Sequence, residues 1–263
     1  MQFTTTTSNT INGYKIVTVK DNTALFYNHG ELLAIVESPN LLGFNFNELR
    51  PYCYEANGLK LSRMDASCST WEGLSLRNSH MENSSLNSAT FEGCDLMGSN
   101  LSRATANSTN FSYADLRSIK ASRLMATGAN FNKTCLMEAD LTNSYLQSAT
   151  FIEADLYACR MHEADLRGAS FARAKLCSAK FCDADLRGAN LSSADLDGAD
   201  LRGADLRGAD LKWADLSNAD LSYVDFRGAD LSRADLSGAN LHGTNFEGAI
   251  LTSATVDTDE DAL

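Results

Sequence analysis

The sequence predicts an all-β solenoid whose turns are square in cross-section, and two periods carry this prediction. From Leu61 to Val256, an apolar residue, usually a large one, recurs at every fifth position in one register, for 40 units without insertion. If this residue is called i, a small residue usually stands at i−2 and Asp or Asn at i−1. A longer period of twenty residues groups four such units into one turn, so that like residues stack along the axis. The aromatic series shows this period best: Trp71, Phe91, Phe111, Phe131, Phe151 and Phe171.

The run DGADLRGADLRGADLKWADL, residues 197–216, excludes the two regular alternatives. Five residues of an α-helix turn through about 500°, so successive leucines would spiral round the helix and form no apolar stripe. An odd spacing on a single β-strand sends alternate leucines to opposite faces. Only a chain that turns a corner in every unit keeps all the leucines on one interior.

We therefore expect i and i−2 to point inward and i−1, i+1 and i+2 to point outward. About ten turns, stacked at the strand spacing of about 4.8 Å, would form a rod of roughly 50 Å. In several weak units, such as Ile119/Ala121 and Leu124/Ala126, the large residue has moved to i−2, which conserves the core volume. The alternative there is a loop that bulges out near 104–126, where Ala104 and Ala106 are both small.

The units ADLRG, ADLKW, ADLSN and ANLSS resemble the pentapeptide-repeat family, over about 200 of the 263 residues. The resemblance implies a right-handed quadrilateral β-helix, with the handedness supplied by the family.

Four segments follow from the pattern. Residues 1–38 are expected to form a small N-terminal β unit or cap, with strands over 14–19, 23–28 and 32–37 and turns at 21–22 and 29–30. Residues 39–60 are expected to form a degenerate lead-in coil, 61–256 the β-helix and 257–263 an acidic tail. An open solenoid end exposes backbone donors and acceptors, which is why a cap is expected.

Composition limits the class of protein. Seven cysteines without a CxxC pair indicate free thiols in a reducing compartment. The chain has no stretch of about 18 apolar residues and no basic, apolar signal at its start, so we expect a cytoplasmic protein without a membrane span. The alternative is an effector secreted without a cleaved signal peptide.

No enzyme is predicted. The four histidines do not form a metal-spaced pair, and no nucleophile elbow, phosphate-binding loop or dinucleotide fingerprint is present. Cys177 and Cys182 fall on neighbouring sides and could approach each other, although unpaired thiols are the simpler expectation. We expect no catalytic residue, metal or cofactor.

The charge is concentrated in the C-terminal part. The net charge is −12, and residues 181–263 hold 6 Lys/Arg against 17 Asp/Glu. This excess of acids argues against direct nucleic-acid binding there, because phosphate contacts need cations. On one side Asp165, Asp185, Asp205 and Asp225 alternate with arginines. Over residues 195–257 the opposite side has no cation in its i−1 and i+1 columns, and its candidate partner-binding acidic face is Asp195, Asp197, Asp215 and Asp235. Ordinary solvated aspartates are the alternative interpretation.

A weaker candidate surface consists of outward apolar side chains. Met97, Met137 and Tyr157 share one column, and Trp213 and Tyr223 point outward elsewhere. Scattered exposed apolar residues are also normal.

Some pentapeptide-repeat proteins resemble duplex DNA and protect gyrase or topoisomerase IV from inhibitors. The resemblance therefore implies a protein partner, such as a DNA-binding protein. The sequence lacks the inserted loop and the C-terminal dimerisation helix of the resistance-type members, so a monomer or an end-to-end dimer is expected. The rival hypothesis is an effector or scaffold that docks on a partner that does not bind DNA, through its N-terminal region and its apolar patch.

Overall fold

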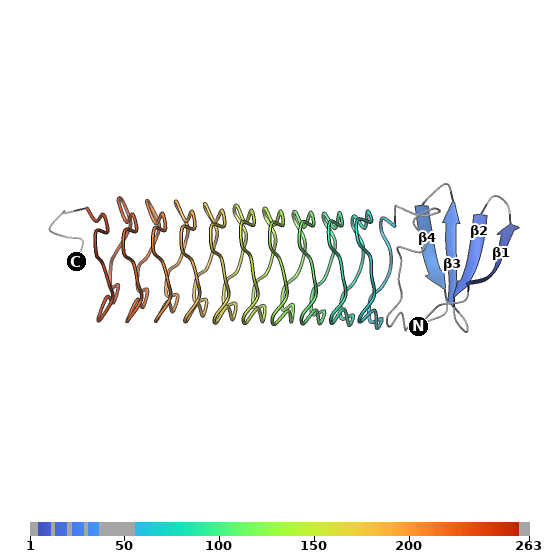
Figure 1. Cartoon of the computed structure of the whole chain (residues 1–263), viewed down its shortest axis with the longest axis horizontal. Coiled ribbons are helices and arrows are strands. Elements are labelled where there is room, and N and C mark those ends of the chain that lie inside the picture. The colour runs from blue at the N-terminus through green and yellow to red at the C-terminus, as the bar shows by residue number, and fades with distance from the viewer. Residues whose placement is uncertain (1–4, 12–13, 20–22, 29–30, 37–55, 258–263) are drawn as a thin grey trace.

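The computed structural model describes residues 5–11, 14–19, 23–28, 31–36 and 56–257. The N-terminal part is an antiparallel sheet of four strands in the order β1-β2-β3-β4. The strands are β1 (Thr5–Ile11), β2 (Tyr14–Val19), β3 (Thr23–Asn28) and β4 (Glu31–Val36). The rest is a long β-helical solenoid (Figure 1).

The strands compare closely with the sequence prediction. β2 and β3 have the predicted bounds, and β4 begins and ends one residue earlier than expected. β1 was not predicted, because TTTSNTI is too polar to read as a strand, and it pairs with β2 along its whole length. The predicted turns at 21–22 and 29–30, most of the lead-in coil and the tail beyond Asp257 lie outside the described residues.

Each five-residue unit of the solenoid satisfies its backbone by one recurring pattern. Leu201 and Gly203 donate their N–H groups to the next coil, at 2.9 and 3.0 Å, and Asp220 donates back to Ala199 O at 2.9 Å. Ala204 N closes the corner turn onto Leu201 O at 2.9 Å. Residues at i−1 are bridged in parallel to residues twenty positions later, which confirms the predicted stacking in a period of twenty.

The corners need a left-handed residue. The residue at i+2 has a φ of 53° to 70° in all 40 units from Gly58 to Ser253, as in the third position of a type II turn. Glycine occupies 14 of these positions and Asn or Asp several more, because these residues adopt this conformation at least cost. Regular turns begin at Gly58, one unit before the predicted start, with Ala56 and Leu59 already buried.

The core runs the length of the solenoid along the i and i−2 positions. The weak units belong to it as well: Ala104, Ala106, Ile119 and Leu124 are all buried. The predicted register therefore continues through 104–126, and the alternative of a bulging loop is wrong. At the C-terminal end the core becomes partly open, where Leu251 is exposed and Phe246 half-buried.

Five aromatic contacts in a row demonstrate how closely the coils stack. Ring centroids in the series from Trp71 to Phe171 are 5.7, 5.3, 5.0, 4.8 and 4.7 Å apart, with interplanar angles of 11° or less. The spacing settles at the separation of neighbouring β-strands, so each ring lies on the next without any tilt of the coil. Beyond Phe171 the column continues with leucine.

Candidate protein-binding surface

Four outer sides follow from the square coil, and each is named by its inward column. The inward residues of the ring side are the phenylalanines from Phe91 to Phe171, and those of the acidic side include Leu196, Leu216 and Leu236. The inward residues of the basic side include Leu101, Ala121 and Leu141, and those of the Asp/Arg side include Leu166, Leu186 and Leu206. Along the chain the order is basic, Asp/Arg, ring, acidic. The acidic side therefore meets the basic side at a corner and lies opposite the Asp/Arg side.

Aspartate at i−1 has a structural task on every side. The backbone N–H at i+1 is the one donor that the coil-to-coil and turn bonds leave over, and the i−1 carboxylate accepts it through Oδ1. Arg202 N donates in this way to Asp200 and Ser217 N to Asp215. Asparagine does the same work, as between Asn190 and Ser192 N at 2.9 Å. An aspartate at i−1 is therefore explained by the fold alone, and only the contacts of its second oxygen can indicate a function.

On the Asp/Arg side the second oxygen binds arginine. Arg187 donates to Asp185 Oδ2 at 2.6 Å within its own coil and lies 3.6 Å from Asp205 Oδ2 in the next. The same pairs repeat at Arg167 and Arg207. The Arg187 hydrogen bond is the main cause that lowers the pKa of Asp185, and it outweighs the opposing effect of burial. This side is an ion-pair ladder with its charge compensated.

The acidic side lacks this compensation. Asp215 and Asp235 each accept both the backbone N–H and the hydroxyl of the serine two residues on, through Oδ1. Asp197 Oδ1 accepts from Ser217 Oγ at 3.2 Å and from Asn218 Nδ2 at 2.8 Å. No described residue forms an ion pair with any of these carboxylates, whose side chains are partly exposed.

Two neighbours mark the N-terminal edge of this acidic stretch. Lys175 is bridged to Asp195 through the backbone, but its Nζ lies 3.8 Å from Asp155 in the preceding coil. Cys177 is next in the column before Asp197; burial, followed by the Asp195 carboxylate, raises the pKa of its thiol to about 12. Asp257 extends the face at the C-terminal end, where Oδ2 accepts Gly238 N at 2.5 Å.

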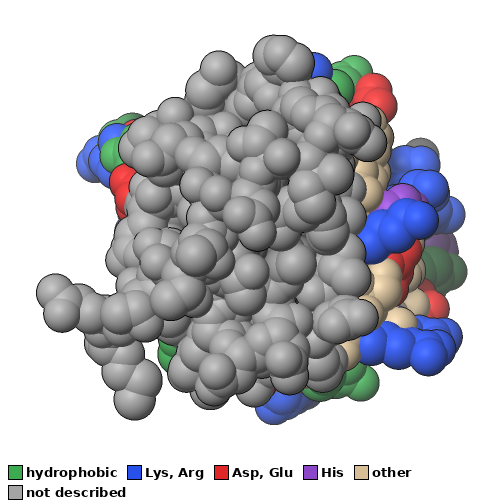
Figure 2. Space-filling view, turned by 90° about the vertical axis from the view of Figure 1, so that its right-hand side faces the viewer, with side chains coloured by type: hydrophobic (Ala, Val, Ile, Leu, Met, Phe, Trp, Pro, Cys, Tyr) green, Lys and Arg blue, Asp and Glu red, His purple; other side chains and the backbone are tan. Residues whose placement is uncertain are grey.

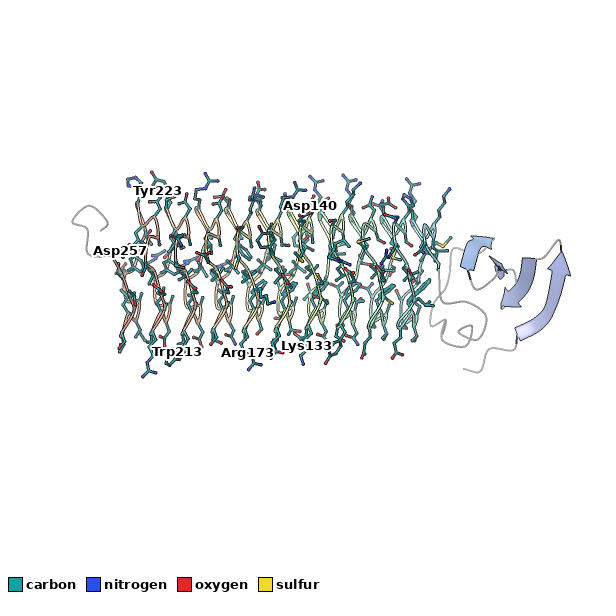
Figure 3. The ribbon with its side chains drawn as sticks, turned by 90° about the horizontal axis from the view of Figure 1, so that it is seen from above. Lys133, Asp140, Arg173, Trp213, Tyr223 and Asp257 are labelled. Atoms are coloured by element: carbon teal, nitrogen blue, oxygen red, sulfur yellow. The ribbon has the colours of Figure 1, made fainter. Side chains whose placement is uncertain are left out.

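The apolar candidates do not form one patch. Met97, Met137 and Tyr157 lie in the same column as Cys177 and Asp197. They therefore belong to the N-terminal half of the acidic side, as the period of twenty residues predicts. Trp213 and Tyr223 project from opposite edges of the rod (Figure 3). The Trp213 ring lies 4.3 Å from the Arg233 guanidinium, and the Tyr223 ring packs edge-on against His242.

The basic side was not predicted from the sequence. Lys/Arg and His side chains gather on one flank of the molecule (Figure 2), and all three described histidines, His80, His162 and His242, belong to the basic side. Its cations are far apart in the sequence. They lie on the same side only because the coil repeats every twenty residues. The exposed members of its N-terminal half are Lys60, Arg63, Arg103, Lys120 and Arg123.

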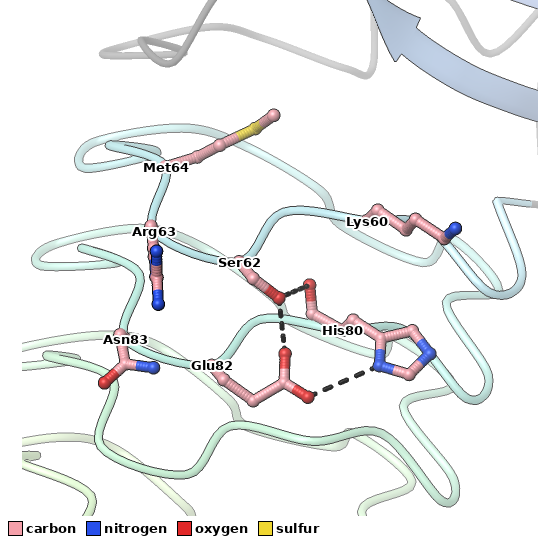
Figure 4. Close-up of a pocket in the computed structure, with 7 residues that line it drawn as sticks. All are labelled: Lys60, Ser62, Arg63, Met64, His80, Glu82 and Asn83. Carbon is pink, nitrogen blue, oxygen red and sulfur yellow. Dashed lines mark hydrogen bonds and ion pairs between the residues drawn. The ribbon is translucent and has the colours of Figure 1, made fainter.

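A shallow hollow of about 860 Å³ lies at the start of the basic side (Figure 4). It contains a serine, a histidine and a glutamate, but in the wrong order for nucleophilic catalysis. Ser62 Oγ donates to Glu82 Oε2 at 2.5 Å, and His80 Nδ1 is 3.3 Å from Glu82 Oε1, so the imidazole does not reach the hydroxyl. Burial works to raise the pKa of Glu82, yet the Ser62 and His80 contacts outweigh it and lower the pKa. A hydroxyl bonded to so weak a base is not an activated nucleophile.

Other reactive groups give no site within the described part of the chain. Cys177 and Cys182 are both free, and burial raises the pKa of Cys182 to about 11. The described residues include no group of three His, Cys, Asp or Glu side chains that could hold a metal ion. Across the same residues, no helix has the length and apolar character needed to cross a membrane.

Comparisons with known proteins agree with this architecture. The family model for pentapeptide repeats matches eight times, between residues 72 and 252. HetL from the cyanobacterium Nostoc, a pentapeptide repeat protein involved in regulation of heterocyst differentiation, is 28% identical, and the match covers 81% of this chain and 97% of HetL with a TM-score of 0.47. No curated protein matches.

Two further solved structures are similar over shorter lengths. A pentapeptide repeat protein of the Arabidopsis thaliana thylakoid lumen is 39% identical over 37% of this chain and 70% of its own, with a TM-score of 0.35. QnrB1, a plasmid-mediated fluoroquinolone resistance protein, is 24% identical over 70% of this chain and 90% of its own, with a TM-score of 0.38.

The family matches and the stacked five-residue units lead to one conclusion. The chain belongs to the pentapeptide-repeat family, a group of structural and binding scaffolds, and folds as a right-handed quadrilateral β-helix.

Proposed function

We propose that this protein binds a DNA-binding protein, such as a gyrase or another topoisomerase, by presenting its acidic side where that partner holds a DNA strand. The observation that carries the proposal is the absence of ion pairs, among the described residues, on Asp195, Asp197, Asp215, Asp235 and Asp257. The equivalent aspartates of the Asp/Arg side are all paired with arginine.

The charge density supports this partner class. Five carboxylates lie on four successive coils, which span about 14 Å at the usual strand spacing. With four intervals between five charges, that is about one charge per 3.6 Å, close to the one charge per roughly 3.4 Å of a single DNA strand. The face therefore has the charge density of one strand, about half that of a duplex, and it would fit a partner surface that holds one strand edge-on.

The proposal is tested by measuring supercoiling by purified gyrase, with and without a quinolone, at micromolar concentrations of this protein. We expect inhibition of supercoiling or protection from the drug. The variant Asp195→Asn/Asp197→Asn/Asp215→Asn/Asp235→Asn should lose the effect. It should keep its fold, because asparagine already makes the i−1 hydrogen bond at Asn190 and already occupies the i+1 position at Asn107.

A matched control carries the same change of charge on the opposite side: Asp165→Asn, Asp185→Asn, Asp205→Asn and Asp225→Asn. This control should act like the wild type. Neither inhibition nor protection by the wild type would exclude gyrase as the target, and equal loss in both variants would show that only total charge matters.

A second candidate function rests on the column of Met97, Met137 and Tyr157. The protein would then be a scaffold that docks a partner without DNA-binding activity. Tyr157→Ala with Met137→Ala should abolish capture of such a partner in a pull-down and leave the gyrase assay unchanged. Deletion of residues 1–38 tests the expected contribution of the N-terminal sheet to docking or delivery.

A further inference from the structure

The N-terminal half of the basic side is a strip of cations without carboxylate partners. Its three outward columns over four coils hold twelve residues, and the others are histidine, serine, asparagine and one acid, Glu82, which is bonded to Ser62 and His80. No described residue forms an ion pair with the cations of this basic strip, which are Lys60, Arg63, Arg103, Lys120 and Arg123. In a chain with more acids than bases, this local excess of exposed cations is available to an anionic partner.

The chain carries a complementary surface of its own. We propose that the basic strip of one molecule binds the acidic side of a second molecule, with the two solenoids antiparallel. In this register the coil of Asp195 and Asp197 faces the coil of Lys120 and Arg123. The coil of Asp215 faces Arg103, and the coil of Asp257 faces Lys60 and Arg63.

The same alignment is complementary in charge over the next two coils beyond the strip. It brings Lys175 of one molecule opposite Asp140 of the other, and Asp155 opposite Arg160. The coil of Asp235 faces His80, which is paired with Glu82. Because that coil presents a carboxylate and no Lys or Arg, it is the one unfavourable contact among the four coils of the strip.

The spacing of the coils explains why a second copy fits better than another anion. Both surfaces repeat at one coil spacing, about 4.8 Å, so the coils stay in register, and opposite charges face each other on three of the four coils. The phosphates of a DNA strand repeat at about 3.4 Å, so they match the coil spacing only in average charge density.

The contact cannot form within one molecule. The coils of Asp195 and Lys120 belong to different sides and are separated by nearly four coils, or roughly 18 Å, along a rigid rod. Since the two surfaces differ, the contact is heterologous. A dimer keeps the free acidic side of one molecule and the free strip of the other, so association continues unless a ring closes.

The test exploits this asymmetry and measures mass by light scattering or sedimentation at about 50 mM and 500 mM salt. Wild type should associate at low salt and dissociate at high salt, because ions screen exposed charges. The strip variant Arg103→Asn/Lys120→Asn/Arg123→Asn should be monomeric at both. Its asparagines follow residues already in the same columns, Asn83 and Asn100.

The acidic-side variant with four Asp→Asn changes should also be monomeric alone. An equimolar mixture of the two variants should form a dimer and nothing larger, because each retains one intact surface. A control, Arg167→Gln/Arg187→Gln/Arg207→Gln, removes three ion-paired cations, with Gln147 as precedent in that column, and should associate like wild type.

A monomeric wild type at low salt, or a mixture that stays monomeric, would overturn the proposal. A wild type that stays monomeric yet binds single-stranded DNA through the strip would assign the strip to nucleic acid instead. The gyrase assay with the monomeric strip variant, whose acidic side is intact, reports on the proposed function separately, so either idea can fail alone.

Discussion

A single residue position, i−1, illustrates how structure and function share the same side chain. Every aspartate there uses one oxygen to satisfy a backbone N–H of its own turn. What differs is the second oxygen, which binds arginine at Asp185 and has no ion-pair partner among the described residues at Asp215. The repeat therefore fixes the identity of the residue, and the residue two positions on decides whether its charge is available to a partner.

Asp200 provides a test of this division at the residue scale. The hydrogen bond from Arg202, at 2.7 Å, is the main cause that lowers the pKa of Asp200 to about 2, ahead of burial, which opposes it. Because the pKa is depressed in the folded state, the ionised carboxylate stabilises the fold above pH of about 4. That stability is lost as the pH falls from about 4 toward 2.

We expect Arg202→Gln to raise the pKa of Asp200 toward about 3.9, its value in an unfolded chain, and to shift the acid unfolding midpoint upward. A carboxyl-carbon NMR titration measures the change directly. Arg233→Gln is the control, since the Arg233 guanidinium lies on Trp213 and pairs with no described carboxylate. An unchanged pKa in Arg202→Gln would show that the turn, rather than the arginine, sets it.

At the scale of the element, the column is the unit of stability. Phe131 lies between Phe111 and Phe151 at 5.0 and 4.8 Å, almost parallel to both. Phe131→Ala would break two stacked contacts and leave a cavity that the rigid coils cannot close. We expect a loss of about 3–5 kcal/mol in the free energy of unfolding, measured by urea denaturation.

The exposed Tyr157 supplies the comparison, because it is an aromatic side chain on an outer column. Tyr157→Ala should change the free energy of unfolding by no more than about 0.5 kcal/mol. A loss below about 1 kcal/mol in Phe131→Ala would contradict the stacked column.

The columns also show which features of the structure could be predicted from the sequence. Periods of five and twenty predicted the register, the inward positions and the pairing of Asp185 with Arg187, because these depend only on counting. The strip of Arg103, Lys120 and Arg123 follows from the same count but was not predicted, since its members come from two different outward columns, i−1 and i+2. The course of Lys175 toward Asp155 could not be predicted, because a flexible side chain chooses between two coils.

At the scale of the whole molecule, the solenoid is nearly one-dimensional, and each coil contacts chiefly its neighbours. Deleting one full coil should therefore leave every later residue on its side, whereas deleting one unit should move every later residue to the adjacent side. Leucine occupies the inward positions of all four sides just beyond residue 200, at 206, 211, 216 and 221, so both deletions keep a packed core.

Deletion of residues 201–220 removes one coil and stacks Asp235 directly on Asp195. We expect this variant to melt cooperatively and to keep partner binding within severalfold, with four of the five carboxylates still aligned. Deletion of residues 201–205 should fold equally well but turn Asp215 and Asp235 onto the ring side, and it should lose binding. Circular dichroism measures the folding of both variants and the gyrase assay their binding. Equal binding by the two deletions would mean that the alignment of the acidic side is irrelevant to the partner, whereas failure of the 201–205 deletion to fold would mean that the four sides are not interchangeable.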